Sequence, residues 1–369
     1  MSLAPDPAAD SVVRAIATLR GRAGRVTLLR RTDRGLYCEA GDFYVDPWAA
    51  VDRAVVTHAH GDHVAWGCRA YLTSAAGAPV LRQRLDPSAR IRGAAYGDGV
   101  DVNGVRVSLH PAGHILGSAQ VRVEHEGQVW VVSGDYKTEP DPTCAPWEPV
   151  RCHTFVTECT FGLPVYRWPP AAAVFEEIHT WWRANQDAGR ATLLFAYALG
   201  KAQRLIAGLD PAVGPILTHG AVERMNAVYR EGGVPLPPTI HAAASDRASW
   251  RRAIVVAPPS ADGSTWARRF GTQSTAFASG WMALRGMRRR QAVDRGFTIS
   301  DHVDWPSLLA AIDATGAERI WTTHGYTSVL VRWLREHGRD AEAIETRYEG
   351  ERDDVDEAAA TIDESLPAR

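Results

Sequence analysis

The chain has few cysteines, and they do not form the pairs that a disulfide framework or a cysteine metal site would use. The number of cysteines is odd, and no Cys-x-x-Cys motif occurs. We therefore expect reduced, mostly structural thiols in a cytosolic protein. The five cysteines are Cys38, Cys68, Cys144, Cys152 and Cys159.

The chain also lacks a long apolar run. No stretch approaches the roughly 20 apolar residues of a membrane-spanning helix. The first residues include Asp6 and Asp10 and contain no apolar signal core, so we expect no secretion and a cytoplasmic location.

A marked excess of charge of either sign is absent as well, since the formal net charge is −2. Any surface that binds nucleic acid must therefore be a local one. What the chain does have is 45% hydrophobic residues and 13 Trp in 369 residues. That is enough for two domains, or for one large domain with an insertion.

The pattern of residues changes near the middle of the chain. Residues 1–24 show weak periodicity and predict an arm. Between 25 and 163, short strand-like runs alternate with Gly and Asp turns and few convincing helices. After Pro164, strands alternate with helices such as Ala171–Asn185 and Trp305–Thr315, which predicts βαβ units around a parallel sheet. A helix over Ser328–His337 is expected to close the ordered part, and residues 341–369 are expected to form an acidic tail without an assigned function.

A string of metal-ligand residues follows one strand-like run. After Val55-Val56-Thr57 comes a His-x-His-x-Asp-His motif, which consists of His58, His60, Asp62 and His63. Imidazole and carboxylate ligands together suit zinc, manganese or iron, and three imidazoles favour zinc. A polar loop with surface histidines would explain one lone His, but not this string.

Further ligand candidates stand where other strand-like runs end. His114 follows Gly113, Asp135 follows Ser133-Gly134, and His324 precedes Gly325. Each alone is more typical of a surface residue. Together with the string, they predict one metal site assembled from distant parts of the sequence.

These motifs resemble the successive metal motifs of the metallo-β-lactamase fold. The resemblance implies an α/β protein with an αββα sandwich and the metals at one edge of its two sheets. Asp46 matches the early Asp of that family, which supports the ligand loop as a hydrogen-bond acceptor without binding metal directly.

The large separation between Asp135 and His324 then predicts an inserted second domain. Thr157–Gly162, Ser300–Asp304 and Thr323–Gly325 resemble motifs A, B and C of the β-CASP nucleases, in which the insert covers the metals. Gly162–Trp168 and Ser279–Met282 resemble bacterial ligase-associated DNA exonucleases, also labelled mRNA 3′-end processing factors. The expected domains are an arm (1–24), a metallo-β-lactamase core in two parts (25–163 and 296–340), an inserted α/β β-CASP domain (164–295) and the tail (341–369).

By carry-over from this family, two divalent metal ions would be bound, with Zn²⁺ expected and Mn²⁺ as the alternative. One ion would be held by His58, His60 and His114, the other by Asp62, His63 and His324, with Asp135 bridging them. A hydroxide between the ions would be the nucleophile. The catalytic residues would be Asp62, Asp135, His302 as general acid, and Glu158, which orients His302.

Alternatives remain open at several of these residues. Asp301 could orient His302 in place of Glu158, Asp304 could be structural, and His302 could be a helix-capping or core residue. The candidates for contacts with substrate phosphate are Lys201, Ser279, Ser300, Arg288 and Arg289. Trp168 or Trp281 could stack on a base.

The sequence therefore predicts a metal-dependent nuclease that acts on DNA, as an exonuclease in DNA repair or processing. An RNA-processing nuclease of the same fold is the alternative. A small-molecule metallo-hydrolase fits less well, because it needs neither the insert nor the Glu158/His302 pair, and an inactive scaffold would not keep every ligand. The resemblance also implies a functional association with an ATP-dependent DNA ligase and a helicase.

Overall fold

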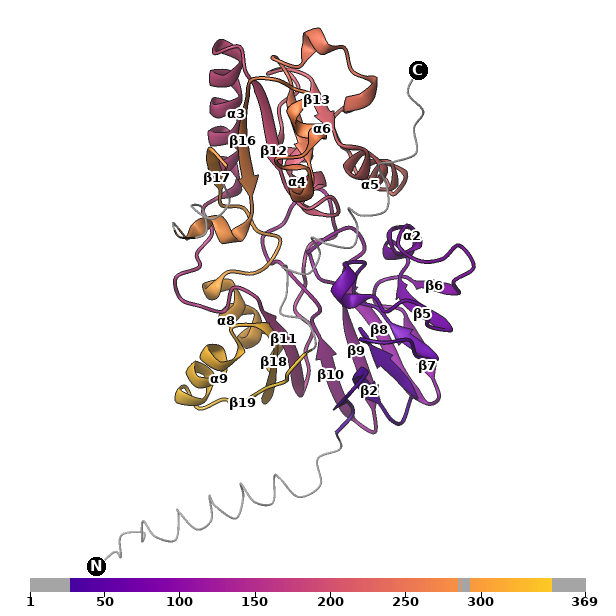
Figure 1. Ribbon diagram of the computed structural model, residues 1–369. Coiled ribbons are helices and arrows are strands. Elements are labelled where there is room, and N and C mark those ends of the chain that lie inside the picture. Colours follow the sequence, from indigo (N-terminus) through magenta and orange to yellow (C-terminus); the bar gives the residue numbers. More distant parts are fainter. Residues whose placement is uncertain (1–26, 285, 287–292, 347–369) are drawn as a thin grey trace, which may run out of the picture.

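A computed structural model describes residues 27–284, 286 and 293–346. Within them, three β-sheets and the helices that cover them form a mixed α/β protein (Figure 1). This confirms the predicted fold class at that level. The predicted arm (1–24), Arg288 and Arg289, and the tail from residue 347 onward lie outside the described residues.

The first sheet contains six strands in the order of the sequence. Its first three strands pair antiparallel and the remaining strands pair parallel. The strands are β1 (Arg30–Thr32), β2 (Gly35–Cys38), β3 (Phe43–Val45), β4 (Arg53–Val55), β5 (Ala70–Ser74) and β6 (Ile91–Ala94).

The second sheet contains seven strands in the order β19-β18-β11-β10-β9-β8-β7. Its interior strand β11 pairs parallel with β18, so that Phe155 lies opposite Ile320. Strands from both sides of the predicted insertion therefore complete one sheet. They are β7 (Gly99–Val102), β8 (Val105–Pro111), β9 (Ala119–His125), β10 (Gln128–Val132), β11 (Thr154–Cys159), β18 (Arg319–Gly325) and β19 (Asp340–Ala343).

These two sheets share one hydrophobic core. Phe43 and Val55 of the first sheet pack in the same cluster as Val107, Val123 and Trp130 of the second. Because successive side chains of a strand point to opposite faces, the neighbours of these residues reach the outer faces. The outer face of the second sheet packs against α8 (Trp305–Thr315) and α9 (Thr327–Glu336), and that of the first against α2 (Gly77–Arg82).

The third sheet is built from the predicted insertion (164–295), except that its last strand extends past the predicted boundary to Phe297. All its strands pair parallel, in the order β14-β13-β15-β12-β16-β17, which confirms the parallel sheet expected from the alternating pattern. The strands are β12 (Ala191–Phe195), β13 (Ile216–Thr218), β14 (Ile240–His241), β15 (Ile254–Ala257), β16 (Gln273–Ala278) and β17 (Arg295–Phe297).

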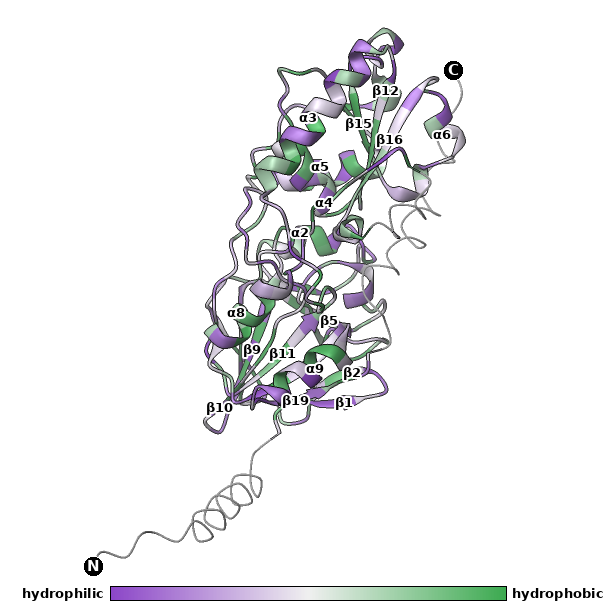
Figure 2. Cartoon of the chain, turned by 90° about the vertical axis from the view of Figure 1, so that its left-hand side faces the viewer, coloured by the Kyte–Doolittle hydropathy of each residue, from purple (hydrophilic) through white to green (hydrophobic). Residues whose placement is uncertain are grey.

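Helices cover both faces of this third sheet. The helices α3 (Ala171–Asp187) and α4 (Lys201–Gly208) pack on one face, and α6 (Thr265–Arg268) packs on the other. The strand β15 is apolar and buried between these layers, whereas α3 mixes polar and apolar residues (Figure 2). The helix α5 (Gly220–Glu231) packs on the same face as α3 and α4 through Val222, and its Val228 and Tyr229 also share a cluster with α2 of the ligand-bearing part of the chain.

The structure differs from the sequence expectations at several elements. The helix α2 lies in the segment 25–163, where the sequence predicts short strands and few helices. A strand, β19, also follows the last helix. Its residues, Asp340–Ala343, have low strand propensity, and they form a strand because they pair with the edge of β18. Among the described residues, no helix is long and apolar enough to cross a membrane.

The core shared by the two sheets gives a first prediction. Leu109 is 1% exposed within it, so Leu109→Ala should lower the free energy of unfolding by about 2–5 kcal/mol, through lost burial and an unfilled cavity. Urea unfolding followed by tryptophan fluorescence measures this loss. The exposed Val329 on α9 is the control, because Val329→Ala should change the value by no more than about 0.5 kcal/mol; equal effects would contradict the packing described here.

Candidate metal centre

The His-x-His-x-Asp-His string lies on the loop that follows β4. Val55 and Val56 are buried, and a short 3₁₀ turn over Gly61–His63 ends the string. This turn folds the string back, so that the rings of His60 and His63 both contact the ring of His58. The imidazoles of His58, His60 and His63 are all buried.

One group of ligand atoms consists of His58, His60, His114 and Asp135. The Nδ1 atom of His60 lies 3.1 Å from His58 Nε2 and 3.0 Å from His114 Nε2. The Oδ2 atom of Asp135 lies 3.5 Å from His58 Nε2 and 3.8 Å from His114 Nε2. Four residues from three separate loops therefore point their ligand atoms at one position.

A second group consists of Asp62, His63 and His324. The Nε2 atom of His63 lies 3.6 Å from Asp62 Oδ2 and 3.5 Å from Asp135 Oδ1. Asp135 thus presents one carboxylate oxygen to each group. This is the arrangement that a bridging ligand requires, and the structure brings all the predicted metal ligands together.

The chemistry of these residues fits divalent metal ions. Burial lowers the pKa of His58, His114 and His324, and neighbouring histidines lower it further, which keeps these imidazoles in the neutral form that binds metal. Burial opposes ionisation of Asp135, but His63 and other histidines nevertheless hold its pKa well below the usual value. These groups could therefore act as ligands without first losing a proton near neutral pH.

The environment of His63 is the observation that most directly indicates a cation-binding site. Its Nε2 atom is buried and makes no hydrogen bond to the described residues, although an unpaired buried polar atom is costly. Burial lowers the pKa of His63, but the carboxylates Asp62, Asp135 and Asp46 outweigh it and raise that pKa well above its usual value. A site that attracts a proton so strongly would also attract a metal ion.

Asp46 forms hydrogen bonds with residues at both ends of the Thr57–His63 loop. Its Oδ2 atom lies 2.7 Å from His63 Nδ1, and its Oδ1 atom accepts a hydrogen bond of 2.8 Å from the Thr57 backbone N–H. The Thr57 hydroxyl donates a further bond of 2.6 Å to Oδ2. Asp46 is placed where the resemblance implies, in contact with a ligand residue and on the side of the ring away from the ligand groups.

Glu158 and His302 form a buried pair beside the ligands. Both carboxylate oxygens of Glu158 lie 2.9 Å from His302 Nδ1. Glu158 is itself held by the backbone N–H of Tyr136 at 2.9 Å. Asp135, Glu158 and His302 form a third cluster of ligand-type atoms, and the rings of His114 and His302 are 4.8 Å apart.

The neighbouring acidic residues contact other partners. The Asp301 carboxylate faces Lys201 and Arg204, with Lys201 Nζ 3.2 Å from Asp301 Oδ2, so Glu158 and not Asp301 orients the His302 ring. Asp304 caps α8, since its side chain accepts hydrogen bonds from the backbone N–H groups of Ser307 and Trp168. Asp304 therefore has the structural role that the sequence left open.

The predicted phosphate-binding residues are mostly buried. Lys201, Ser279 and Ser300 are each 2% exposed or less. The Ser279 side chain caps a 3₁₀ turn, and the Ser300 side chain accepts a bond from the His302 N–H at 3.1 Å. Their role in substrate binding stays a prediction, as does that of Arg288 and Arg289, which lie outside the described residues.

The sequence reasoning missed two supports of the ligands. The backbone carbonyl of Leu199 lies 3.2 Å from His60 Nε2, and that of Asp301 lies 2.9 Å from His114 Nδ1. A backbone carbonyl leaves no signal in a sequence. Arg204 donates to the Ser300 carbonyl, a contact that its sequence position three residues after Lys201 does not reveal.

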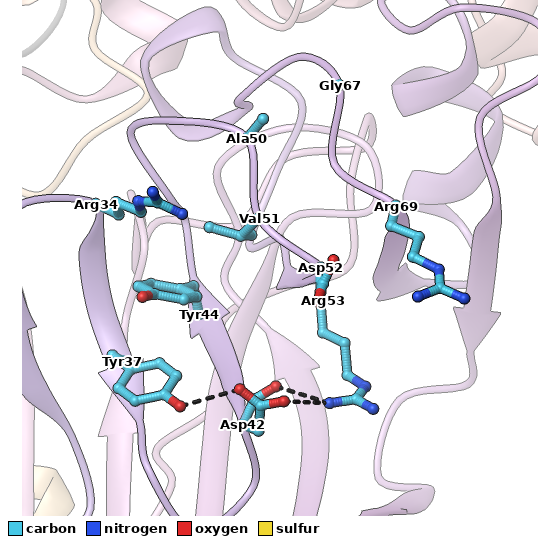
Figure 3. Close-up of a pocket in the computed structure, with 10 residues that line it drawn as sticks. All are labelled: Arg34, Tyr37, Asp42, Tyr44, Ala50, Val51, Asp52, Arg53, Gly67 and Arg69. Carbon is cyan, nitrogen blue, oxygen red and sulfur yellow. Dashed lines mark hydrogen bonds and ion pairs between the residues drawn. The ribbon is translucent and has the colours of Figure 1, made fainter.

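One surface pocket lies apart from these groups. It has a volume of about 400 Å³ and contains none of the predicted site residues. Figure 3 shows that Asp42 joins Tyr37 and Arg53 at its base, whereas Arg34 and Arg69 extend from its sides. Because its charges are partly neutralised in this way, the pocket is a weaker candidate for function than the buried ligand groups.

Gly134, next to Asp135, allows a test of the ligand geometry. Its φ is +56°, and a Cβ atom would lie 2.6 Å from Thr57 Cβ, so Gly134→Ala should displace Thr57 and Asp135 and reduce the metal content of the purified protein. Gly127→Ala is the matched control, because φ is +76° there and no atom lies within 4 Å of the added Cβ. Elemental analysis after dialysis measures the metal; equal retention by both variants would contradict the geometry.

Comparisons with known proteins agree with these motifs. No family model matches the chain. A protein named Probable DNA ligase from Opitutus terrae is 33% identical over 84% of this chain and 30% of its own length. Proteins named Endoribonuclease YSH1 from Saccharomyces cerevisiae and Endoribonuclease ysh1 from Schizosaccharomyces pombe are 31% and 33% identical, over 34% and 33% of this chain.

The chain spans less than a third of the length of these relatives, since it covers 30% of the first and 16% of each endoribonuclease. The endoribonucleases are β-CASP proteins, and the relative that matches most of the chain carries the name of a ligase. Together with the assembled ligand groups, these matches support a relationship of the chain to the β-CASP nucleases and to their ligase-associated members.

Proposed function

We propose that this chain is a nuclease that hydrolyses phosphodiester bonds of DNA from an end, with two divalent metal ions, Zn²⁺ in the first place and Mn²⁺ as the alternative. His58, His60 and His114 would hold one ion and Asp62, His63 and His324 the other, with Asp135 between them. In this proposal the two sheets with a shared core, and the helices on their outer faces, are the αββα sandwich of the family.

The observation that carries the proposal is the Glu158–His302 pair beside the ligand groups. A metal site alone would also suit a small-molecule hydrolase. A buried imidazole fixed by a carboxylate, with its ring 4.8 Å from the ring of His114, would add a proton donor for the leaving group. Phosphodiester hydrolysis needs such a donor, because the leaving alkoxide is a strong base.

The residues of the chain would divide the work as follows. Two bound ions would neutralise phosphate charge and supply a nucleophilic water of lowered pKa, near 7 in favourable sites. Glu158 holds Nδ1 of His302 and so favours a proton on the imidazole, which His302 would transfer from Nε2 to the leaving oxygen. Asp135 and the buried histidines keep the ligand atoms in place.

Aromatic residues next to His302 support a nucleic-acid substrate. The Trp168 indole N–H donates to the His302 carbonyl at 2.8 Å. Phe161 contacts both Trp168 and Trp281, with ring centroids 4.8 and 4.7 Å apart. Both Trp residues are half-buried, so each keeps an exposed part on which a base could stack.

The relatives favour DNA and keep RNA as the second candidate. The relative that covers most of this chain is named a DNA ligase, which supports a DNA substrate and a functional association with a ligase. The endoribonuclease relatives match a shorter part of the chain and support the alternative, an RNA-processing nuclease. The helicase partner stays a prediction from the resemblance.

The role of His302 can be separated from metal binding. His302→Ala should keep the bound metal and lower turnover by about 10²–10⁴-fold, the usual contribution of a positioned general acid. Asp135→Ala should lose both metal and hydrolysis. Metal analysis and cleavage of a labelled oligonucleotide measure the two effects.

The exposed His337, which directly follows α9, is the control for these variants, and His337→Ala should match the unmodified protein. If His302→Ala cleaves at the normal rate, His302 is not the acid. If it loses metal as Asp135→Ala does, it is a ligand instead.

Substrate and polarity need a separate comparison. Matched single-stranded DNA and RNA, labelled at the 5′ or the 3′ end, are incubated with the Zn²⁺ or Mn²⁺ protein. We expect release of single nucleotides from one end of DNA, and slower cleavage of RNA. Equal or faster cleavage of RNA would overturn the DNA assignment, and internal fragments would overturn the exonuclease assignment.

A further inference from the structure

The segment Gly200–Arg204, expected from the sequence to grip phosphate, instead packs against the ligand loops. Gly200 has φ +88°, and a Cβ atom there would lie 2.2 Å from Ile115 Cγ2 and 3.8 Å from His60 Nε2. The side chain of Gln203 accepts from the Gly200 N–H at 2.8 Å and donates to the Ala198 carbonyl at 3.1 Å. This tight turn places the Leu199 carbonyl 3.2 Å from His60 Nε2.

The cations of this segment belong to a buried charge network. Lys201 Nζ lies 3.2 Å from Asp301 Oδ2, and Arg204 Nη1 lies 3.2 Å from Asp301 Oδ1. Arg204 Nη2 also contacts Glu139 at 2.8 Å, and its Nε lies 3.7 Å from Asp141 Oδ2. Lys201, Arg204 and Asp301 are each no more than 4% exposed.

The network is balanced in charge, which explains how it can be buried. Lys137 pairs with Asp141, so three cations face three carboxylates. Burial opposes ionisation of Asp301, but Lys201 and Arg204 hold its pKa well below the usual range. A buried charge network of this kind is stable only when every member is present, because removal of one group leaves another buried charge without its partner.

The charge network is connected to His114, one of the proposed metal ligands. The Arg204 guanidinium donates to the Ser300 carbonyl as well as to the Asp301 carboxylate, which clamps the backbone between these two residues. The Asp301 carbonyl, on the same stretch, lies 2.9 Å from His114 Nδ1. The inserted segment thus contacts His60 directly, through the Leu199 carbonyl, and supports His114 indirectly, through Arg204. In the second group, His63 is instead contacted by Asp46.

We propose that Lys201 and Arg204 are positioning residues for the first metal group, made of His58, His60, His114 and Asp135, and do not bind substrate phosphate. They fix the Ser300–Asp301 backbone that orients His114, and their helix α4 begins at the turn that orients His60. The proposal deepens the function proposed above and rests on the two metal ions of that function.

The test is a titration of the metal-free full-length chain with Zn²⁺ against a competing chelator. Arg204→Met should raise the dissociation constant of one ion by about 10–100-fold, the usual effect of losing a group that orients a ligand, and leave the other ion unchanged. Arg183→Met is the control, since Arg183 is exposed on α3 and should leave both ions unaffected. Arg204→Lys, which keeps the charge but loses the forked donors, should recover part of the affinity.

A double variant identifies which ion is lost. Asp46→Asn should weaken the second ion alone, so Arg204→Met combined with Asp46→Asn should bind neither ion tightly. If the double variant still binds one ion as tightly as either single variant, both changes act on the same ion and the proposal is overturned. Visible absorption of the Co²⁺-loaded proteins reports the same difference through the coordination geometry.

Other outcomes are equally decisive. Unchanged affinity for both ions in Arg204→Met, together with weaker binding of a single-stranded oligonucleotide, would overturn the proposal in favour of phosphate binding. If Arg204→Met does not fold, Asp301→Asn takes its place, and unchanged affinity for both ions would again overturn the proposal. Because these measurements use Zn²⁺ alone, a chain that binds two ions but cleaves no nucleic acid would refute the proposed function without affecting this result.

Discussion

The structure around the site depends on one buried carboxylate. Asp135 is 6% exposed, and each of its oxygens faces a different group of imidazoles, with His58 and His114 on one side and His63 on the other. A carboxylate in this position is costly to bury unless cations or donors compensate for it. The chain therefore surrounds Asp135 with imidazoles, and the same surroundings create two adjacent places for a divalent cation.

The sheet topology explains how residues so distant in sequence meet. In the second sheet β11 pairs parallel with β18, so that Glu158 lies opposite Thr323, directly before His324. Asp135 follows β10, the other neighbour of β11. The ends of neighbouring parallel strands meet at one edge of a sheet, which is where polar loops collect. The inserted segment connects β11 to the strand beside it without disturbing this edge.

Much of the site could be predicted because its ligands are side chains of unusual type at strand ends. The string His58–His63 stands out by itself, and Asp135 and His324 each follow an apolar run. The supports were harder to predict, since the carbonyls of Leu199 and Asp301 act through the backbone and every residue has one. In the fold, β19 escaped prediction for a related reason: it exists because of its partner strand and not because of its own residues.

The buried charge network also constrains how substrate can reach the metals. If the inserted segment swung away at α4, Lys201 and Arg204 would separate from Asp301, and the ion pairs that join them in the structure would be lost. The same motion would withdraw the Leu199 carbonyl from His60 and loosen the first ligand group. Opening at this contact would thus weaken the metal site whenever substrate entered. In the proposed enzyme, movements that leave α4 in contact with Asp301 would keep the first ligand group intact, so the inserted segment would act as a wall of the site and not as its cover.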